Sequence, residues 1–154
     1  MQKITTFLWF DHEAEEAAHF YASIFKNSKV IDVNRFRGPG GQERVTVVKF
    51  ELDGQQFIAL NGGPHFKFTE AISLYVNCAT QQEVDELWTK LTAGGLESQC
   101  GWLKDRYGLS WQIVPGVLTE LLSDPDPARS QRVMKAMLQM KKINIEALKR
   151  AHAG

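Results

Sequence analysis

Three polar side chains of this chain could take part in acid–base chemistry: His65, Asp105 and Tyr107. An imidazole titrates near neutral pH and can act as a general base or bind an anion, while a carboxylate or phenol can orient or protonate a substrate. Each residue also has a structural interpretation. His65 precedes Phe66 in a connecting segment whose aromatic residues can fill a hydrophobic gap, and Asp105 and Tyr107 belong to an Asp-x-x-Gly turn that the aspartate side chain can shape. The pattern favours the structural interpretation and leaves the catalytic one open.

Large aromatic residues fall on the expected strands of both halves of the chain. With a few polar groups beside them, such residues can line a pocket for a flat or apolar organic molecule, although core packing is the alternative for each one. We expect ligand contacts from these side chains: Trp9, Asn61, His65, Phe66, Tyr75, Trp102 and Gln112.

The first half of the chain predicts the element order β-α-β-β-β. Its opening segment is apolar almost throughout, which predicts a strand buried on both faces, and Asp11 is placed to cap the helix that follows. Asp53-Gly54 between two apolar runs is a strong hairpin signal. The expected elements are a strand at 4–10, a helix ending near Lys26, and strands at 30–36, 45–52 and 56–60.

The second half repeats this order. Leu8 and Phe25 correspond to Leu74 and Leu91 under one shift of 66 positions (74 − 8 and 91 − 25). A period of this size indicates two packed half-domains rather than a solenoid, and paired half-domains tend to form a cleft. The expected elements are a strand at 72–77, a helix from Thr80 to Leu91 stopped by Gly94-Gly95, and strands at 99–104 and 109–114.

The C-terminal segment has no counterpart in the repeat. Asp126 and Pro127 predict a helix start, and Val133, Met137 and Met140 form an apolar stripe at helical spacing that could pack on the sheet or on a partner subunit. We therefore expect an α+β fold: one domain at 1–116 of two β-α-β-β-β modules, at about 3–61 and 71–115, with a C-terminal helical extension at 117–154. A homodimer is expected, with the extension as one surface for it.

Composition and charge narrow the class of protein. The 154 residues are 44% hydrophobic, and 18 Lys and Arg balance 18 Asp and Glu, so no net field would recruit nucleic acid or anionic lipid. We expect no membrane span and no signal peptide, and the two cysteines, Cys78 and Cys100, lack metal-binding or disulfide-framework spacing. These features predict a cytoplasmic protein without nucleic-acid or membrane partners.

Three segments carry a resemblance to a known family: Asn61 to Phe68, Cys100 to Gln112, and Asp124-Pro125-Asp126-Pro127. Together with the doubled module, they resemble the PhnB-like branch of the vicinal oxygen chelate superfamily, which includes glyoxalase I, bleomycin-resistance proteins and extradiol dioxygenases. Proteins of this branch are commonly labelled demethylubiquinone 3-methyltransferase-like. The resemblance covers essentially the whole chain and implies a glyoxalase/bleomycin-resistance-like fold.

The resemblance also implies where a metal would bind. In metal-dependent members, the first and last strands of each half present His, Glu or Gln side chains to a divalent ion. Position by position, this chain matches only Gln112, and one ligand does not hold a metal. We therefore expect no metal and no other cofactor. The methyltransferase label lacks support of its own, because the glycine clusters at 38–41 and 62–63 do not lie between a strand and a helix start.

The predicted function is metal-independent binding of a small organic molecule in an aromatic cleft. The alternatives are an enzyme of the glyoxalase/dioxygenase superfamily, that is, a metal-dependent lyase, isomerase or dioxygenase, or a methyltransferase as the label implies.

Overall fold

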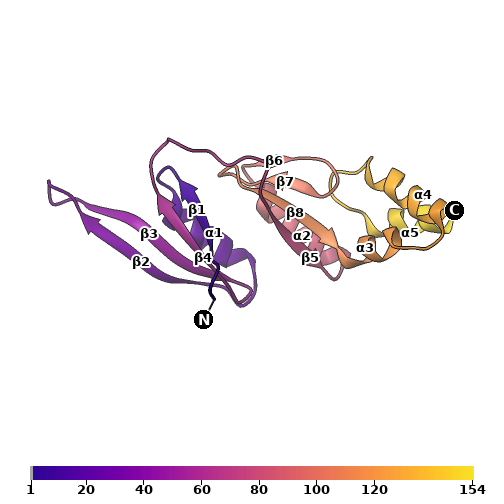
Figure 1. Ribbon diagram of the computed structural model, residues 1–154, viewed down its shortest axis with the longest axis horizontal. Coiled ribbons are helices and arrows are strands. Elements are labelled where there is room, and N and C mark those ends of the chain that lie inside the picture. Colours follow the sequence, from indigo (N-terminus) through magenta and orange to yellow (C-terminus); the bar gives the residue numbers. More distant parts are fainter. Residues whose placement is uncertain (1) are drawn as a thin grey trace. The chain divides into compact units, whose positions relative to one another are not determined.

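A computed structural model describes residues 2–154 of the chain. The chain forms two compact units, the first ending at Phe68 and the second running from Thr69 to Gly154. The boundary falls in the predicted connection between the two modules, and the C-terminal helices belong to the second unit (Figure 1).

The first unit has the predicted β-α-β-β-β order. Its elements are β1 (Thr6–Phe10), α1 (Ala14–Ile24), β2 (Lys29–Arg37), β3 (Glu43–Leu52) and β4 (Gln55–Asn61). The strands lie in the order β1-β4-β3-β2, with β1 and β4 parallel and the other neighbours antiparallel. At the predicted hairpin, Asp53 and Gly54 both have positive φ, 48° and 82°, as a type I′ turn requires.

The core of the first unit lies between its sheet and α1. Leu8 and Phe10 of β1 are buried with Tyr21 of α1 and Phe50 of β3. The prediction that the first strand is buried on both faces is wrong within this unit: Phe7 is 54% exposed. Helix α1 covers only one face of the sheet, so alternate residues of β1 face away from the core.

The start of α1 differs from the prediction as well. Glu13, not Asp11, occupies the N-cap position. The backbone N–H of Ala14 donates to Oδ1 of Asn61 at 2.8 Å. A helix needs acceptors for its first N–H groups, and here one comes from the end of β4, 47 residues away in sequence.

The second unit repeats the arrangement with shorter strands. Its elements are β5 (Ser73–Cys78), α2 (Gln81–Thr92), β6 (Leu96–Glu97), β7 (Trp102–Lys104) and β8 (Ser110–Pro115). The sheet order is β5-β8-β7-β6, and β5 and β8 are parallel. The predicted strand at 99–104 begins only at Trp102, because Cys100 and Gly101 have positive φ values of 57° and 85°. Strand β6 was not anticipated.

Helix α2 follows the sequence prediction closely. Its N-cap Thr80 accepts a hydrogen bond from the Glu83 N–H at 3.1 Å, and the Glu83 carboxylate accepts one from Ala79 at 2.8 Å. The predicted apolar face is buried through Val84, Leu87 and Leu91, and together with Trp88 it forms the buried side of the helix.

Three helices, α3 (Gly116–Leu122), α4 (Pro127–Met137) and α5 (Ile145–Ala153), form the C-terminal extension. Val133 is fully buried in a cluster with Ile143 and Leu148, and Met137 and Met140 pack against that cluster. The predicted apolar stripe of α4 is therefore used inside the second unit. Within residues 2–154, every helix is too short or too polar to cross a membrane.

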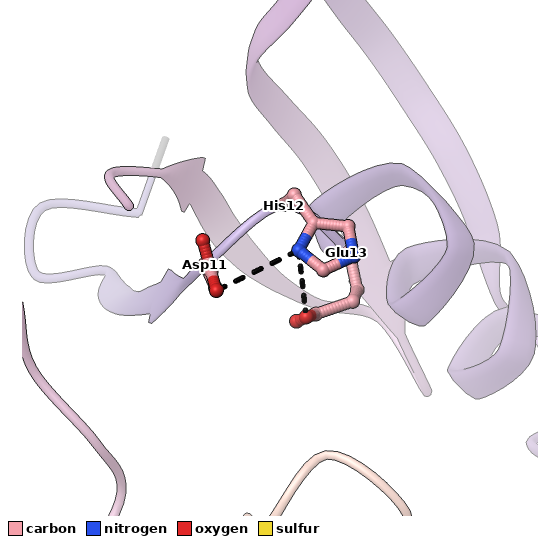
Figure 2. A group of neighbouring side chains, drawn as sticks. All are labelled: Asp11, His12 and Glu13. Atoms are coloured by element: carbon pink, nitrogen blue, oxygen red, sulfur yellow. Dashed lines mark ion pairs between the residues drawn. The ribbon is translucent and has the colours of Figure 1, made fainter. Parts of the chain in front are cut away.

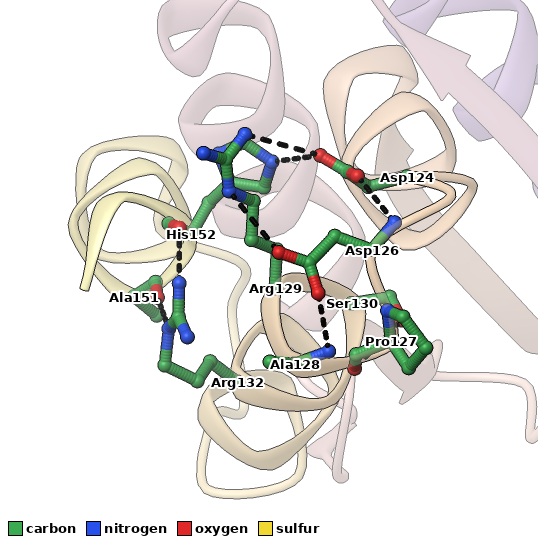
Figure 3. Close-up of polar contacts among 9 residues, drawn as sticks. All are labelled: Asp124, Asp126, Pro127, Ala128, Arg129, Ser130, Arg132, Ala151 and His152. Carbon is green, nitrogen blue, oxygen red and sulfur yellow. Dashed lines mark hydrogen bonds and ion pairs between the residues drawn. The ribbon is translucent and has the colours of Figure 1, made fainter.

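Polar contacts fasten the ends of these helices to one another (Figure 3). As predicted, Asp126 caps α4, accepting from Ala128 N–H at 3.0 Å with Pro127 in the first turn. Arg132 donates to the carbonyl oxygens of Ala151 and His152 at 2.9 and 2.8 Å, which satisfies the C-terminus of α5. Nε2 of His152 lies 2.7 Å from Oδ2 of Asp124.

Candidate functional site

The first unit contains a groove of about 920 Å³. It lies where the parallel strands β1 and β4 end and α1 begins, and the β2–β3 connection forms its other wall. The lining residues are Asp11, His12, Glu15, Glu16, Phe36, Gly38, Pro39, Arg44, Val45, Thr46, Asn61, Gly62 and Gly63. Its volume lies within the range typical of small-molecule sites.

Asn61 holds three segments of this groove in place. Its Oδ1 accepts from the first N–H of α1, and its Nδ2 donates to the Val45 carbonyl at 3.1 Å. The amide thus ties the end of β4 to both α1 and β3. Because both ends of the amide are engaged with backbone groups, the role that the structure gives Asn61 is to shape the groove.

Trp9 and Phe66 support the Gly62-Gly63 segment. Trp9 Nε1 donates to the Gly63 carbonyl at 2.9 Å, and the rings of Trp9 and Phe66 meet edge to face with centroids 4.9 Å apart. A Cβ atom at Gly62 would overlap the Trp9 indole, so only glycine permits this approach. Two of the predicted aromatic residues are therefore brought together beside the groove, although neither lines it.

The charges of the groove come from two sides. Asp11, Glu15 and Glu16 lie at the α1 side, and Arg44 comes from β3. Glu15 is paired with Arg35 at 2.9 Å. The acidic side chains thus outnumber the one arginine in the lining.

His12 sits at the rim of the groove between two carboxylates (Figure 2). Its Nδ1 lies 3.2 Å from Glu13 and 3.7 Å from Asp11, and its side chain is 79% exposed. Among the described residues, these three form the group of His, Cys, Asp and Glu side chains close enough to share an ion. Three sequence neighbours on a largely exposed turn carry no metal assignment by themselves, because exposed acidic groups commonly lie close together without an ion.

In the second unit, Tyr75, Gln112 and Trp102 form one row across the sheet. Gln112 of β8 pairs with Tyr75 of β5 and with Trp102 of β7, so the three side chains share a face. Gln112 donates through Nε2 to Ser73 Oγ at 2.9 Å, and Tyr75 is 55% exposed. Of the seven predicted ligand-binding residues, this unit holds these three, and the first unit holds the other four.

Asp105 has the geometry of a turn-forming residue. It is 3% exposed, and its Oδ1 accepts from the N–H groups of Tyr107 and Leu109 at 2.8 and 3.1 Å. Its Oδ2 accepts from Trp111 Nε1 at 2.9 Å. With both oxygens engaged, the carboxylate orders the β7–β8 connection. Of the other two acid–base candidates, Tyr107 lies in this same connection, and His65 is exposed in the loop after β4 in the first unit.

The strands that would carry a superfamily metal do not supply a ligand set. Strands β1, β4, β5 and β8 contain no His, Asp or Glu. Gln112 is engaged with Ser73, and burial raises the pKa of the Cys78 thiol on β5 to about 12. Since a divalent ion needs several N, O or thiolate ligands together, these strands do not fit one.

Several groove residues escaped the sequence analysis: Phe36, Pro39, Arg44 and Thr46. They flank the glycine-rich connection at 38–41, which we interpreted only as a loop. The one available signal was the glycine and proline content beside an alternating strand, since binding residues often lie on loops held by a scaffold.

In each of the two modules, an edge strand pairs in parallel with its neighbour, β1 with β4 and β5 with β8. This doubled arrangement and the family match below define the class: this is a protein of the vicinal oxygen chelate superfamily, in its PhnB-like branch. The sequence profile of the 3-demethylubiquinone-9 3-methyltransferase family matches residues 2–114. The chain belongs to that family. The match ends at the last strand of the second module, so the helices α3 to α5 lie beyond it.

Solved structures agree with this assignment. A putative 3-demethylubiquinone-9 3-methyltransferase, PhnB protein, from Bacillus cereus is 40% identical, with a TM-score of 0.69 over 75% of this chain and 100% of its own. Protein PA1353 from Pseudomonas aeruginosa shares the fold at 15% identity, with a TM-score of 0.63 over 75% of this chain and 98% of its own. The fosfomycin resistance protein FosX from Listeria monocytogenes, in a complex with Mn(II) and sulfate, shares the fold at 15% identity, with a TM-score of 0.50 over 72% of this chain and 88% of its own. No curated protein sequence matches the chain significantly.

Proposed function

We propose that this protein binds a small organic molecule, without a metal, in the groove of the first unit. The observation that carries the proposal is the groove itself, a hollow of about 920 Å³ whose lining combines apolar and charged side chains. Binding sites for small molecules are typically concave, with apolar walls and a few polar groups that fix orientation. Phe36, Pro39 and Val45 supply the apolar part of this lining.

The charges in the lining suggest the polar part of the ligand. Asp11 and Glu16 accept hydrogen bonds, and Arg44 donates them. Because acceptors outnumber donors, a ligand with an apolar body and hydrogen-bond donors or a positive group suits the groove. Trp9 and Phe66 act behind this surface, by fixing Gly62 and Gly63.

Native mass spectrometry of freshly purified protein tests the proposal, because it detects retained ligand, metal and oligomeric state together. We expect a bound organic mass and no stoichiometric metal. The retained ligand, identified after release, should bind wild type and lose about tenfold or more in affinity to Arg44→Ala or Glu16→Gln, as expected for a lost charge-assisted hydrogen bond. Lys49→Ala, a matched change on the exposed side of β3 outside the groove, should bind normally.

Other outcomes favour the other functions. Stoichiometric zinc, iron, nickel or manganese would favour a metalloenzyme of the superfamily. Methyl transfer from S-adenosylmethionine would favour the activity in the family description. The structure offers no specific support for the latter: the glycines at 38–41 join β2 to β3, and Gly62-Gly63 follow β4 into a loop rather than a helix. Retention of no organic mass, together with no binding by groove residues in a ligand screen, would contradict the proposal.

We also infer that the protein forms a homodimer. The support is an apolar sheet face in the first unit that α1 leaves open, with Phe7 54% exposed and Trp9, Ile58 and Leu60 partly exposed. A second copy of the same surface is the simplest cover for such a face, since closed pairs are the commonest oligomers. The extension offers less surface than expected, because Met137 and Met140 pack internally and leave Met134 and Leu138 exposed.

A further inference from the structure

A second, smaller hollow lies on the sheet of the second unit, well defined by residues of that unit alone. Its volume is about 240 Å³, and its walls include Glu70, Leu96, Trp102, Lys104 and Ser110. Ser110 of β8 pairs directly with Lys104 of β7, so both residues lie on the same sheet face. None of the residues predicted to be catalytic lines this hollow.

Among the described residues, the hydroxyl of Ser110 is buried and unpaired. The residue is 1% exposed, and across residues 2–154 its Oγ finds no hydrogen-bond partner. Buried polar side-chain atoms are normally satisfied, and an exception calls for an explanation such as an unfilled ligand position. A group that enters the hollow and bonds to Ser110 would therefore recover a hydrogen bond that the free protein lacks.

Lys104 already binds a carboxylate at the same place. Its Nζ lies 2.6 Å from Oε1 of Glu70, and this ammonium holds the pKa of Glu70 below its ordinary value. Glu70 is 64% exposed at its side chain, whereas Lys104 is 36% exposed. Glu70 is thus the less buried partner, and an exposed ion pair of this kind contributes little net free energy, so another carboxylate can replace it at Lys104.

The other acid in the lining is occupied elsewhere. Glu97 accepts a hydrogen bond from Nε1 of the buried Trp88 at 2.6 Å. The polar groups left to face a ligand are therefore the Lys104 ammonium and the hydroxyls of Ser98 and Ser110. The apolar surfaces of Trp102 and Leu96 lie beside them, the latter 68% exposed. This set suits an anion with an apolar body better than a cation.

We propose that the hollow binds a small organic monocarboxylate, whose carboxylate displaces Glu70 from Lys104 and accepts a hydrogen bond from Ser110, while its apolar body lies against Trp102 and Leu96. The volume is below the range of drug-sized ligands, so the body is no larger than about one ring. Glu70 acts as a built-in competitor that keeps the ammonium neutralised when the ligand is absent. This site is separate from the groove of the first unit and does not depend on it.

Titration of ¹⁵N-labelled protein with phenylacetate, followed by amide chemical shifts, tests the proposal. We expect saturable shifts at Leu96 to Ser98, Trp102 to Lys104 and Ser110, and much weaker binding of the neutral analogue 2-phenylethanol. Amides of the groove in the first unit, such as Thr46 and Gly62, report separately on the other site.

Variants assign the roles of the residues. Ser110→Ala should weaken phenylacetate binding about fivefold, as expected for one neutral hydrogen bond, and Lys104→Met should weaken it about tenfold or more. Glu70→Gln should tighten binding severalfold, because the competing charge is gone. Lys90→Met, which removes an exposed lysine on α2 outside the hollow, is the matched control and should leave binding unchanged.

Ser110→Ala also separates binding from folding. Because the hydroxyl has no partner in the fold, we expect the variant to unfold at the same urea concentration as wild type or a higher one. The proposal is overturned if phenylacetate produces no saturable shifts in these segments, if 2-phenylethanol binds as well, or if Ser110→Ala and Glu70→Gln bind like wild type. Failure here would leave the groove amides as an independent test of the function proposed above.

Discussion

Replacement of Asp105 by asparagine decides whether this residue serves the fold or the chemistry. Its carboxylate is 3% exposed and accepts from Tyr107 N–H, Leu109 N–H and Trp111 Nε1 at 2.8, 3.1 and 2.9 Å. Asparagine can keep the two backbone bonds at one oxygen. Its NH₂ group then faces the Trp111 donor, so one bond is lost and two donors oppose each other.

The magnitude follows from these contacts. A hydrogen bond to a charged group contributes about 1.5–3 kcal/mol, and a buried donor left unsatisfied costs about 1–3 kcal/mol. The two effects overlap for the single Trp111 contact, so we expect Asp105→Asn to lower the free energy of unfolding by about 2–4 kcal/mol. Trp111 itself is 2% exposed, so water does not replace the lost partner.

Urea denaturation followed by tryptophan fluorescence measures this loss. A double-mutant cycle with Trp111→Phe should give a coupling free energy of about 1 kcal/mol or more between the two side chains. Asp53→Asn is the matched control, because Asp53 occupies the corresponding hairpin of the first unit with φ of 48°, a conformation that asparagine tolerates. We expect that control to stay within about 0.5 kcal/mol of wild type. Stability of Asp105→Asn within the same margin, combined with a loss of ligand binding or turnover, would refute the structural role.

Four further outcomes follow from the contacts. Gln81 donates to the Ile143 carbonyl at 3.0 Å and accepts from the Ile145 N–H at 2.7 Å. Gln81→Ala should therefore lower the free energy of unfolding, measured by urea denaturation, by about 1–3 kcal/mol. The control Gln82→Ala, at the exposed neighbouring position, should change it little. Burial raises the pKa of the Cys78 thiol to about 12, so this thiol ionises at a lower pH in the unfolded chain than in the folded one. The free energy of unfolding should therefore fall as pH rises from about 9 to 12, and it should fall more in wild type than in Cys78→Ala. Hydrogen bonds from the Asp126 N–H and then from His152 hold the pKa of Asp124 below its ordinary value. The stabilisation from these contacts is therefore present at neutral pH and should be lost on acidification below the ordinary aspartate pKa, which hydrogen exchange of α5 would detect. The variant Asp124→Asn should abolish that pH dependence. Light scattering at micromolar concentration should give the mass of a dimer, and a monomer would contradict the inferred assembly.

The fold was predictable where local chemistry determines it. Asp53-Gly54, the Thr80 cap, and the Asp126-Pro127 helix start each act within a few residues, and the structure confirms all three. The burial of β1 was not predictable in the same way. Its uniform apolarity looks alike whether one face or both are covered, and only the position of α1 decides between them.

In the candidate site, too, some residues could be predicted from the sequence and others could not. The sequence indicated Trp9, Asn61 and Phe66 near a pocket, and the structure places them beside or within the groove of the first unit. It did not indicate Phe36 or Arg44, because they come from strands that the β2–β3 connection brings to the end of β4. Residues that contact a ligand through such nonlocal folding carry no spacing signal along the chain.

The two copies of the module also explain why the larger groove lies in the first one. In the first unit, the end of β4 and the start of α1 border open space, and Asn61 joins them. The corresponding end of β8 continues at once into α3, and Val114 and Leu118 there join the helical cluster of the extension. The start of α2 is likewise bound by the extension, through the contacts of Gln81 with Ile143 and Ile145. In the second module, the extension therefore occupies the edge that the first module leaves free. As a result, the two copies of the module carry unequal surfaces: an open groove in the first unit and a small hollow on the sheet face of the second.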